Sequence, residues 1–229
     1  MTTNEMADRS SERTRVRRLP ERAVYDRAVV DAIIDEALFC HVGFVHEGHP
    51  FVIPTIHARD GDRLYLHGSP AGRMLRVLGD GTSLCVTATL LDGIVLGRSA
   101  FHHSMNYRSV VILGTARVIA DRNEKVRALT AIVDHVVPGR SEDARPPNDK
   151  EIASTRVLSV SLDEVSGKVR TGPPLDEPDD LDLPVWAGVL PLKIAASAPI
   201  ADEGIPDGVN LPDYLGPSED GPVRFRGER

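Results

Sequence analysis

The segment from Phe51 to Met74, FVIPTIHARDGDRLYLHGSPAGRM, holds the side chains best suited to bind an anion. It is typical of a strand, a hairpin and a second strand that ends in His-Gly-Ser before a short helix. Pro54 lacks a backbone donor and so favours an edge strand. Ser69 and Arg73 add a hydroxyl and a cation near the start of the helix, where a phosphate is well held. The alternative, equally supported by this segment, makes Ser69 a helix cap and Arg73 a solvated surface residue.

Two later segments carry further polar candidates. In HHSMNYRSVVILGTARVI, residues 102–119, Arg108 and Ser109 open a strongly apolar strand and are expected near the rim of a barrel. A structural ion pair explains Arg108 as well, and the residue alone favours that interpretation. In SGKVRTG, Lys168 and Arg170 alternate on a strand and share a face, although solvated lysines are common.

The histidines do not form a recognised metal motif. Five fall in or beside the first strands and two follow later: His41, His46, His49, His57, His67, His102 and His103. Metal sites need ligands at defined spacings, and the sequence has no H-E-x-x-H and no His/Cys quartet. Ordinary strand and turn histidines are the better interpretation, so no metal site is predicted.

The elements that position these residues are short strands and few helices. Apolar spacing predicts a helix over 26–38 with Asp26 as its N-cap, a short helix ending at Gly79, and a helix from Asp121 to about Val137. Residues 39–69 favour a three-strand meander. Two strands follow, SLCVTATL and IVLGRSA, separated by an Asp92-Gly93 hairpin signal. The last two are RSVVILGTARVIA and RVLSVSLDEVSGKVR.

This pattern predicts a mostly β, α+β fold. Six or more antiparallel strands with few crossover helices favour a barrel over a doubly wound sheet. No dinucleotide or P-loop glycine motif is present. We expect a flexible leader over 1–16, one domain over 17–192, and an extended acidic Pro/Gly-rich tail over 193–229, whose scattered apolar residues could contact a partner: Val209, Leu211, Tyr214 and Leu215.

Composition limits the partners and the location. A formal net charge of −7 argues against nucleic acid or an acidic membrane surface as a partner, since both are held by clustered Lys and Arg. No apolar run approaches the ~18–20 residues of a spanning helix, and the polar N-terminus lacks a secretory pattern. We therefore expect a cytoplasmic protein whose Cys40 and Cys85 are reduced and buried.

Together these segments resemble the pyridoxamine 5'-phosphate oxidase-like family of FMN-binding split barrels, and its branch of flavin-nucleotide-binding and nitroimidazole-resistance-like proteins. The resemblance covers about Arg17 to Leu192. It is carried by PFVIPT, by GDRLYLHGS with Gly72-Arg73, by NYRSVVILGTARVI, and by GKVRTG with Trp186-Ala187-Gly188. It implies an antiparallel split β-barrel with a few flanking helices, FMN as the cofactor, and a homodimer.

The resemblance also implies roles for individual residues. Val52, Ile53, Pro54 and Thr55 would pass beside the isoalloxazine ring, and His67, Gly68, Ser69 and Arg73 would surround the phosphate. Arg108 and Ser109 would approach the polar edge of the ring. Lys168, Arg170 and Trp186 would be late contacts that reach across the dimer interface. His67 would be the catalytic proton donor, with a haem ligand as a weaker alternative.

The sequence departs from the true oxidase. It has the plainer VIPT and Ala71-Gly72-Arg73 where the oxidase has basic flavin and phosphate motifs, and it lacks the arginine and histidine pattern that grips pyridoxal phosphate. The expected function is therefore FMN-dependent oxidation or reduction of another small organic molecule, with NAD(P)H as a candidate electron donor. The alternatives are a non-catalytic flavin or haem carrier, and a deazaflavin-dependent reductase on the same fold.

Overall fold

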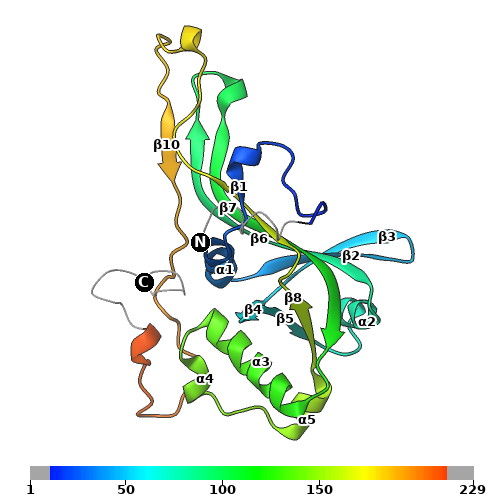
Figure 1. The fold of residues 1–229 in the computed structure, drawn as a ribbon. Coiled ribbons are helices and arrows are strands. Elements are labelled where there is room, and N and C mark those ends of the chain that lie inside the picture. Colours follow the sequence, from blue (N-terminus) through cyan, green and yellow to red (C-terminus); the bar gives the residue numbers. More distant parts are fainter. Residues whose placement is uncertain (1–10, 216–229) are drawn as a thin grey trace.

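The computed structural model describes residues 11–215 (Figure 1). The helices are α1 (Arg27–Glu36), α2 (Arg73–Gly79), α3 (Arg122–Val136), α4 (Arg140–Asp143) and α5 (Asp149–Ser154). The strands are β1 (Ala23–Val24), β2 (Cys40–His46), β3 (His49–Thr55), β4 (His57–Asp60), β5 (Arg63–Gly68), β6 (Ser83–Leu96), β7 (Ser104–Val118), β8 (Arg156–Ser161), β9 (Val165–Arg170) and β10 (Gly188–Pro191). Short 3₁₀ turns are η2 (Pro20–Arg22), η3 (Ala100–His102), η4 (Pro178–Asp180) and η5 (Asp213–Leu215).

The strands form one antiparallel sheet with the order β3-β2-β6-β7-β8-β5-β4. Three more strands extend it: β9 pairs with β7, β1 pairs with β9, and β10 pairs with β6. The ends β3 and β4 do not pair with each other, so the sheet curls without closing. The predicted α+β split-barrel class is confirmed in this form.

The central feature is the ladder between β6 and β7, which runs from Ser83↔Thr115 to Val95↔Ser104. Beyond the rest of the sheet the two strands continue as a long ribbon with β10 beside them (Figure 1). The predicted hairpin at Asp92-Gly93 is wrong, because β6 passes through it with a bulge between Leu91 and Gly93. Gly93 serves close strand approach instead: a Cβ there would lie 3.1 Å from the Leu190 carbonyl oxygen.

Two other strand predictions are also wrong. Residues 39–69 form two hairpins at opposite ends of the sheet, β2-β3 and β4-β5, rather than one meander. Residues 156–170 form two strands, of which β8 pairs with β5 and β7 while β9 pairs with β7 and β1. In both cases the break between two strands falls where the chain changes its pairing partner. Apolar alternation shows which face of a strand is buried but not which strand it pairs with.

The helices cover the sheet as their apolar faces require. Within the barrel, α1 and α2 bury Val30, Ile33, Ile34, Leu75 and Leu78 against the inner faces of the strands. A second cluster lies under α3 and includes Tyr65, Ala128, Ile132 and Val157. The predicted caps are confirmed, because Asp26 accepts from the amides of Ala28 and Val29, and Asp121 accepts from Glu124. Both cysteines are free. Cys40 is buried as predicted, which raises the pKa of its thiol to about 12, whereas the prediction is wrong for Cys85, which is only partly buried.

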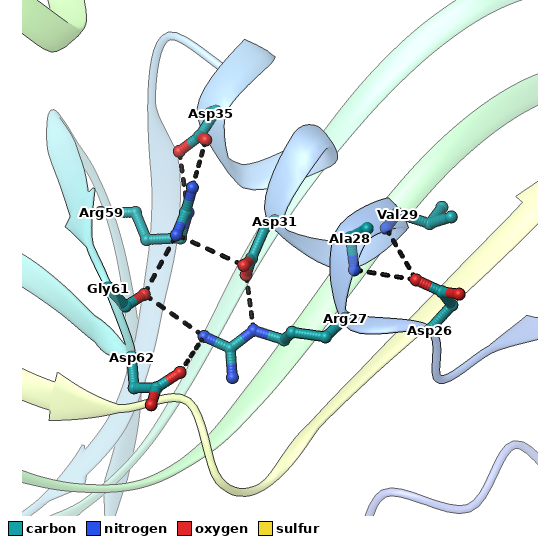
Figure 2. A network of polar contacts seen from close by, with 9 residues as sticks. All are labelled: Asp26, Arg27, Ala28, Val29, Asp31, Asp35, Arg59, Gly61 and Asp62. Carbon is teal, nitrogen blue, oxygen red and sulfur yellow. Dashed lines mark hydrogen bonds and ion pairs between the residues drawn. The ribbon is translucent and has the colours of Figure 1, made fainter. Parts of the chain in front are cut away.

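Ion pairs fix α1 to the β4-β5 hairpin (Figure 2). Arg59 on β4 donates Nε to Asp35 at 2.9 Å and lies 3.3 Å from Asp31. Arg27 on α1 contacts Asp31 at 2.6 Å and Asp62 in the hairpin turn at 2.9 Å. Both guanidinium groups also donate to the carbonyl oxygen of Gly61, which therefore ties the turn to the helix.

Both ends of the described chain contact the body. Thr14 is buried, and the amide of Val16 donates to the hydroxyl of Tyr25 at 2.9 Å. Residues 193–211 form no helix or strand, and Tyr214 then contacts Arg140 and Asp143 of α4. The rest of the predicted leader, residues 1–10, and of the predicted tail, residues 216–229, lies outside the described residues. Among the described helices, none has the length and apolar character to cross a membrane.

Two histidines meet in the interior between α1, β4 and α3. The rings of His57 and His135 are 4.5 Å apart, and each Nε2 donates to a carbonyl oxygen, of Ile34 and Ala37 respectively. Burial, and then the nearby His135, lowers the pKa of His57 from 6.5 to about 4, while the Ile34 carbonyl and Asp35 act in the opposite direction. The neutral ring is therefore the form that the fold accepts.

This burial predicts a loss of stability in mild acid. Because the folded pKa lies below the unfolded one, protons bind preferentially to the unfolded chain as pH falls from about 6.5 to 4. A shift of this size corresponds to about 3 kcal/mol. Urea unfolding at pH 7, 5.5 and 4.5 should show that His57→Gln is less sensitive to pH than the wild type. The exposed control His49→Gln should keep the wild-type slope; equal slopes for all three proteins would contradict the assignment.

Candidate functional site

Strand β3 forms the edge at one end of the sheet and pairs only with β2. The predicted edge position of Pro54 is confirmed. The hairpin turns at Glu47 and Gly48, which both have positive φ angles, 51° and 77°, as a tight two-residue β-turn requires. Val52 and Pro54 are exposed, while Ile53 packs against the barrel core. The outer face of β3 thus presents Val52 and Pro54, and its inner face is occupied by the core.

Arg73 begins α2 and stacks on an aromatic ring. Its Cζ atom lies 4.5 Å from the centroid of Phe51 on β3. Within residues 11–215 no carboxylate lies within ion-pair distance of Arg73, and its side chain is exposed. Ser69 Oγ accepts from the amide of Ala71 at 3.3 Å, which is the cap-like contact expected of it. The stacked guanidinium therefore keeps its hydrogen-bond donors available to an anion.

His67 and Gly68 end β5 just before this turn. His67 is half-buried, and its Nδ1 atom is buried with no hydrogen-bond partner in the described chain. Burial lowers the pKa of His67, so the ring is neutral at pH 7. Gly68 allows close packing with α2, since a Cβ there would lie 3.0 Å from Leu75 Cδ2. A neutral imidazole with an unpaired nitrogen is suited to bind a metal or to accept a hydrogen bond.

Arg108 bridges two carboxylates. It contacts Glu36 at the end of α1 through both terminal nitrogens, and Asp92 at the β6 bulge with distances of 2.7 and 3.0 Å. Hydrogen bonds to Glu36 and then to Asp92 raise the pKa of Arg108 well above its usual range. The ion-pair interpretation that the sequence favoured is confirmed. Its donors are directed at protein carboxylates, and a role in flavin binding stays a prediction.

Ser109 and Lys168 face each other across β7 and β9. They are register partners, and the hydroxyl of Ser109 donates to the carbonyl oxygen of Lys168 at 3.3 Å. The ammonium of Lys168 donates to the carbonyl oxygen of Arg18, in the segment that precedes β1, at 3.1 Å. Register also places Thr89 in this row, on the outer face of the sheet.

Arg170 is a buried cation held by neutral acceptors. It donates to the side-chain oxygen of Asn106 and to the carbonyl oxygens of Gly172 and Pro173, the last at 3.2 Å. Burial lowers the pKa of Arg170, and the nearby Arg22 acts in the same direction. These contacts fix the turn after β9. Trp186, by contrast, is mostly exposed, and its ring covers the backbone of Gly188, where a Cβ would lie 2.8 Å from the indole.

The predicted site residues form two groups. Gly68, Ser69 and Arg73 follow one another where β5 leads into α2, with Arg73 over Phe51 of β3, whereas Ser109, Lys168 and Arg170 follow β7 and β9. Register links the groups through one surface: Pro54 pairs with His41, His41 with Thr87, and Thr87 with Val111, two residues from Ser109. The outer face of the sheet therefore extends from Pro54 to Lys168.

Sequence reasoning missed two partners at this surface. Phe51 was included only as the start of the strand, yet it supports Arg73, and Asn106 holds the buried Arg170. Alternation places Phe51 on the face of β3 opposite Val52, and its contact with Arg73 depends on how α2 packs against that face. Asn106 had no such signal, because its partner lies 64 residues away.

The arrangement fits a flat aromatic ligand that carries a phosphate. An uncovered sheet face can support a planar ring system, Ser109 and Lys168 offer polar atoms along it, and Arg73 offers charge-assisted donors for phosphate oxygens. A metal ion alone fits less well, because no group of three His, Cys, Asp or Glu side chains within residues 11–215 could hold one.

Comparisons with known proteins agree with this chemistry. A family model described as pyridoxamine 5'-phosphate oxidase matches residues 26–169. The flavocytochrome Anf3 of Azotobacter vinelandii is 44% identical, with a TM-score of 0.83 over 89% of this chain and 94% of that one. An FAD and haem binding protein of Mycobacterium smegmatis is 36% identical, with a TM-score of 0.80 over 84% of this chain and 94% of that one.

A third structure is more distant. A Bacteroides thetaiotaomicron protein named for 5-nitroimidazole antibiotic resistance is 30% identical, with a TM-score of 0.55 over 64% of this chain and 86% of that one. A search of curated proteins found no match. The family match covers most of the barrel and includes β3, α2, β7 and most of β9, the elements that carry the candidate site. This chain therefore belongs to the pyridoxamine 5'-phosphate oxidase-like family of flavin-binding split barrels.

Proposed function

We propose that this protein binds a flavin nucleotide and uses it for oxidation or reduction of a small organic molecule. The observation that carries the proposal is Arg73, an exposed guanidinium stacked on Phe51 of the edge strand β3, without a carboxylate partner among the described residues. Two relatives that share at least 36% of their residues with this chain are named for flavin or flavocytochrome character. FMN is the proposed flavin, and FAD carries the same phosphate chemistry.

A bound flavin supplies the hydride chemistry, and the protein supplies binding, orientation and electrostatics. Arg73 and Ser69 hold the phosphate side. Val52 and Pro54 support the ring, and Lys168 donates a hydrogen bond to its polar edge. The Ser109 hydroxyl, whose proton is donated to the Lys168 carbonyl oxygen, accepts a hydrogen bond from that edge. One of the three N–H donors of the Lys168 ammonium is directed at the carbonyl oxygen of Arg18 in this structure. NAD(P)H is the proposed electron donor.

Haem is a second proposed cofactor, bound in addition to the flavin. Both of the more similar relatives described above are named for it, one as a flavocytochrome and one as a haem binding protein. His67 is the proposed ligand, since burial keeps its imidazole neutral and its Nδ1 has no partner in the described chain. A haem ligand must be the neutral form of histidine. In this version of the proposal His67 is not the proton donor.

Two copies of the chain complete the proposed site. Arg73 stacks on Phe51 at the β3 edge, on the face of that strand opposite Val52, whereas Lys168 lies on the outer face of the sheet, so the two residues belong to different groups. A twofold pair would bring the Ser69–Arg73 segment of one copy towards the Lys168–Trp186 segment of the other. The homodimer is therefore part of the proposal.

The cofactor content of the protein as purified from cells tests the proposal directly. Denaturation should release FMN, or FAD in its place, identified by mass, and the native protein should show flavin absorbance that NADH or NADPH bleaches. Flavin that resists bleaching would support a carrier rather than a reductase. A protein without flavin that also fails to take up FMN and FAD would overturn the proposal, and release of a deazaflavin would replace the cofactor.

Arg73→Ala should weaken FMN binding by about 2–3 kcal/mol, roughly 30- to 150-fold, because it removes charge-assisted hydrogen bonds to the phosphate. Riboflavin lacks the phosphate, so its affinity should hardly change. Fluorescence titration of both flavins into apoprotein measures the difference. The control is Arg76→Ala, an exposed arginine of the same helix, which should leave both affinities unchanged. Equal losses for the two flavins would remove Arg73 from the phosphate site.

His67→Ala should abolish the Soret band of the haem-loaded protein and leave the flavin content unchanged. The absorbance ratio of the two cofactors measures this effect, and added imidazole should restore the band by filling the space of the lost side chain. His49→Ala, on the exposed β2-β3 hairpin, is the matched control and should bind haem normally. Haem binding that survives in His67→Ala would assign the ligand elsewhere.

A further inference from the structure

The segment 193–211, here named the C-terminal strap, is fixed at its ends, and between them it makes no long-range hydrogen bond or ion pair to the described residues 11–215. Before it, the amide of Leu192 donates to the carbonyl oxygen of Asp92 at 3.0 Å. After it, the hydroxyl of Tyr214 contacts Asp143 at 2.5 Å and Arg140 at 3.0 Å. Hydrogen bonds of the strap within residues 11–215 are local, such as Ile205 to Asp202 and Val209 to Pro206. The strap thus extends from the β10 ribbon to α4 without support (Figure 1).

The strap is apolar where a solvated linker would be polar. Its large apolar side chains are all exposed, with Ile200 at 97%, and they recur along its whole length: Ile194, Ile200, Ile205, Val209 and Leu211. Holding a chain extended costs about 1–2 kcal/mol of conformational entropy per residue. Contacts among the described residues of one copy do not offset that cost. The strap is therefore suited to pack against a surface of another molecule.

The same chain exposes a second uncovered apolar surface on its ribbon. Strand register places Leu190 beside Ile94 and Ile94 beside Met105, so these side chains form one row across β10, β6 and β7. All three are exposed, at 52%, 37% and 54%, while Val95 on the opposite face is fully buried. We name Leu190, Ile94 and Met105 the apolar row.

A copy cannot cover its own apolar row with its own strap. The strap leaves β10 directly after Leu190 and Pro191 and leads away from the ribbon towards α4 (Figure 1). A second copy related by a twofold axis can exchange the two surfaces reciprocally, strap on row and row on strap. One symmetric contact would then cover both uncovered surfaces.

Area and charge agree with this occupant. Burial of a side chain of this size removes roughly 60–120 Å² from water, so the eight apolar residues, partly covered already, contribute on the order of 300–600 Å² per copy. That is a large part of the roughly 800 Å² per partner in a standard interface. The strap is net negative, because it holds Asp202, Glu203 and Asp207 and one lysine. Residues 11–22, which contact β9 through Lys168, are net positive, with five arginines and two glutamates.

We infer that the C-terminal strap docks on the apolar row of a second copy of this chain. The strap and the apolar row would form a contact surface for the pair of copies proposed above, and this contact does not depend on the flavin. It requires the strap residues to be accessible in a single copy, as their exposure shows.

Sedimentation velocity over a concentration series of the full chain tests the inference. The wild type should dimerise, and a triple aspartate variant at Ile194, Ile200 and Val209 should raise the dimer dissociation constant at least tenfold. A matched variant places the same charges on small exposed strap residues and should dimerise like the wild type: Ser197→Asp, Ala198→Asp and Ala201→Asp. Equal dissociation constants for the three proteins, or a monomeric wild type, would overturn the inference.

A photo-crosslinking residue at position 200 identifies the surface that the strap touches. In a mixture of isotopically light and heavy chains, cross-links should join unlike copies and map to β6, β7 or β10. Cross-links within one copy, or to a different face of the partner, would overturn the inference. Flavin content is measured on the same samples. A flavin-loaded monomer rejects the strap contact and the two-copy site but leaves flavin binding in place, and a strap-dependent dimer unable to take up flavin rejects only the proposed function.

Discussion

The hydrogen-bonded ladder between β6 and β7 is the interaction on which the rest of the structure depends. It pairs the two longest strands over almost their whole length. The other strands attach to these two directly or through one of their neighbours: β2 and β10 pair with β6, and β8 and β9 pair with β7. Because β7 pairs with β9 up to Ile112 and with β8 from Ala116, the strand bends between two partners and curls the sheet. The outer face that carries the candidate site is a product of that bend.

Arginine contacts hold the remaining elements at fixed angles to this ladder. Arg108 joins the end of α1 to the β6 bulge, and Arg59 joins the middle of the same helix to β4. Arg98 joins the end of β6 to Asp176, whose carboxylate also accepts from the Arg98 amide at 2.8 Å. Because these ion pairs are half-buried, each contributes more to stability than an exposed pair does. Desolvation of the two charges offsets part of that gain. Arg73 differs from all of them in stacking on a ring without a carboxylate partner among the described residues.

Local chemistry predicted α1, α2, α3 and the edge position of Pro54, because each depends on residues within a few positions. It failed at Asp92-Gly93, where a turn signal serves a bulge that admits β10, a strand about 100 residues later. It also failed for residues 156–170, whose two strands have different partners. Among the candidate site residues, those of β3 and α2 were recognisable from their types, whereas the ion pairs of Arg108 and the buried position of Arg170 arise from tertiary contacts.

The prolines of β3 affect how the edge of the sheet meets other chains under the crowded conditions in which the protein folds. Because the two-residue turn makes His46 and His49 a hydrogen-bonded pair, the amide positions of residues 50, 52 and 54 point away from β2. Pro50 and Pro54 occupy two of these three positions and have no N–H to offer. A strand from another molecule would therefore find carbonyl acceptors but only the donor of Val52 along this edge. This edge of the sheet is thus protected against edge-to-edge aggregation because it lacks backbone hydrogen-bond donors, rather than by charged side chains or a covering segment.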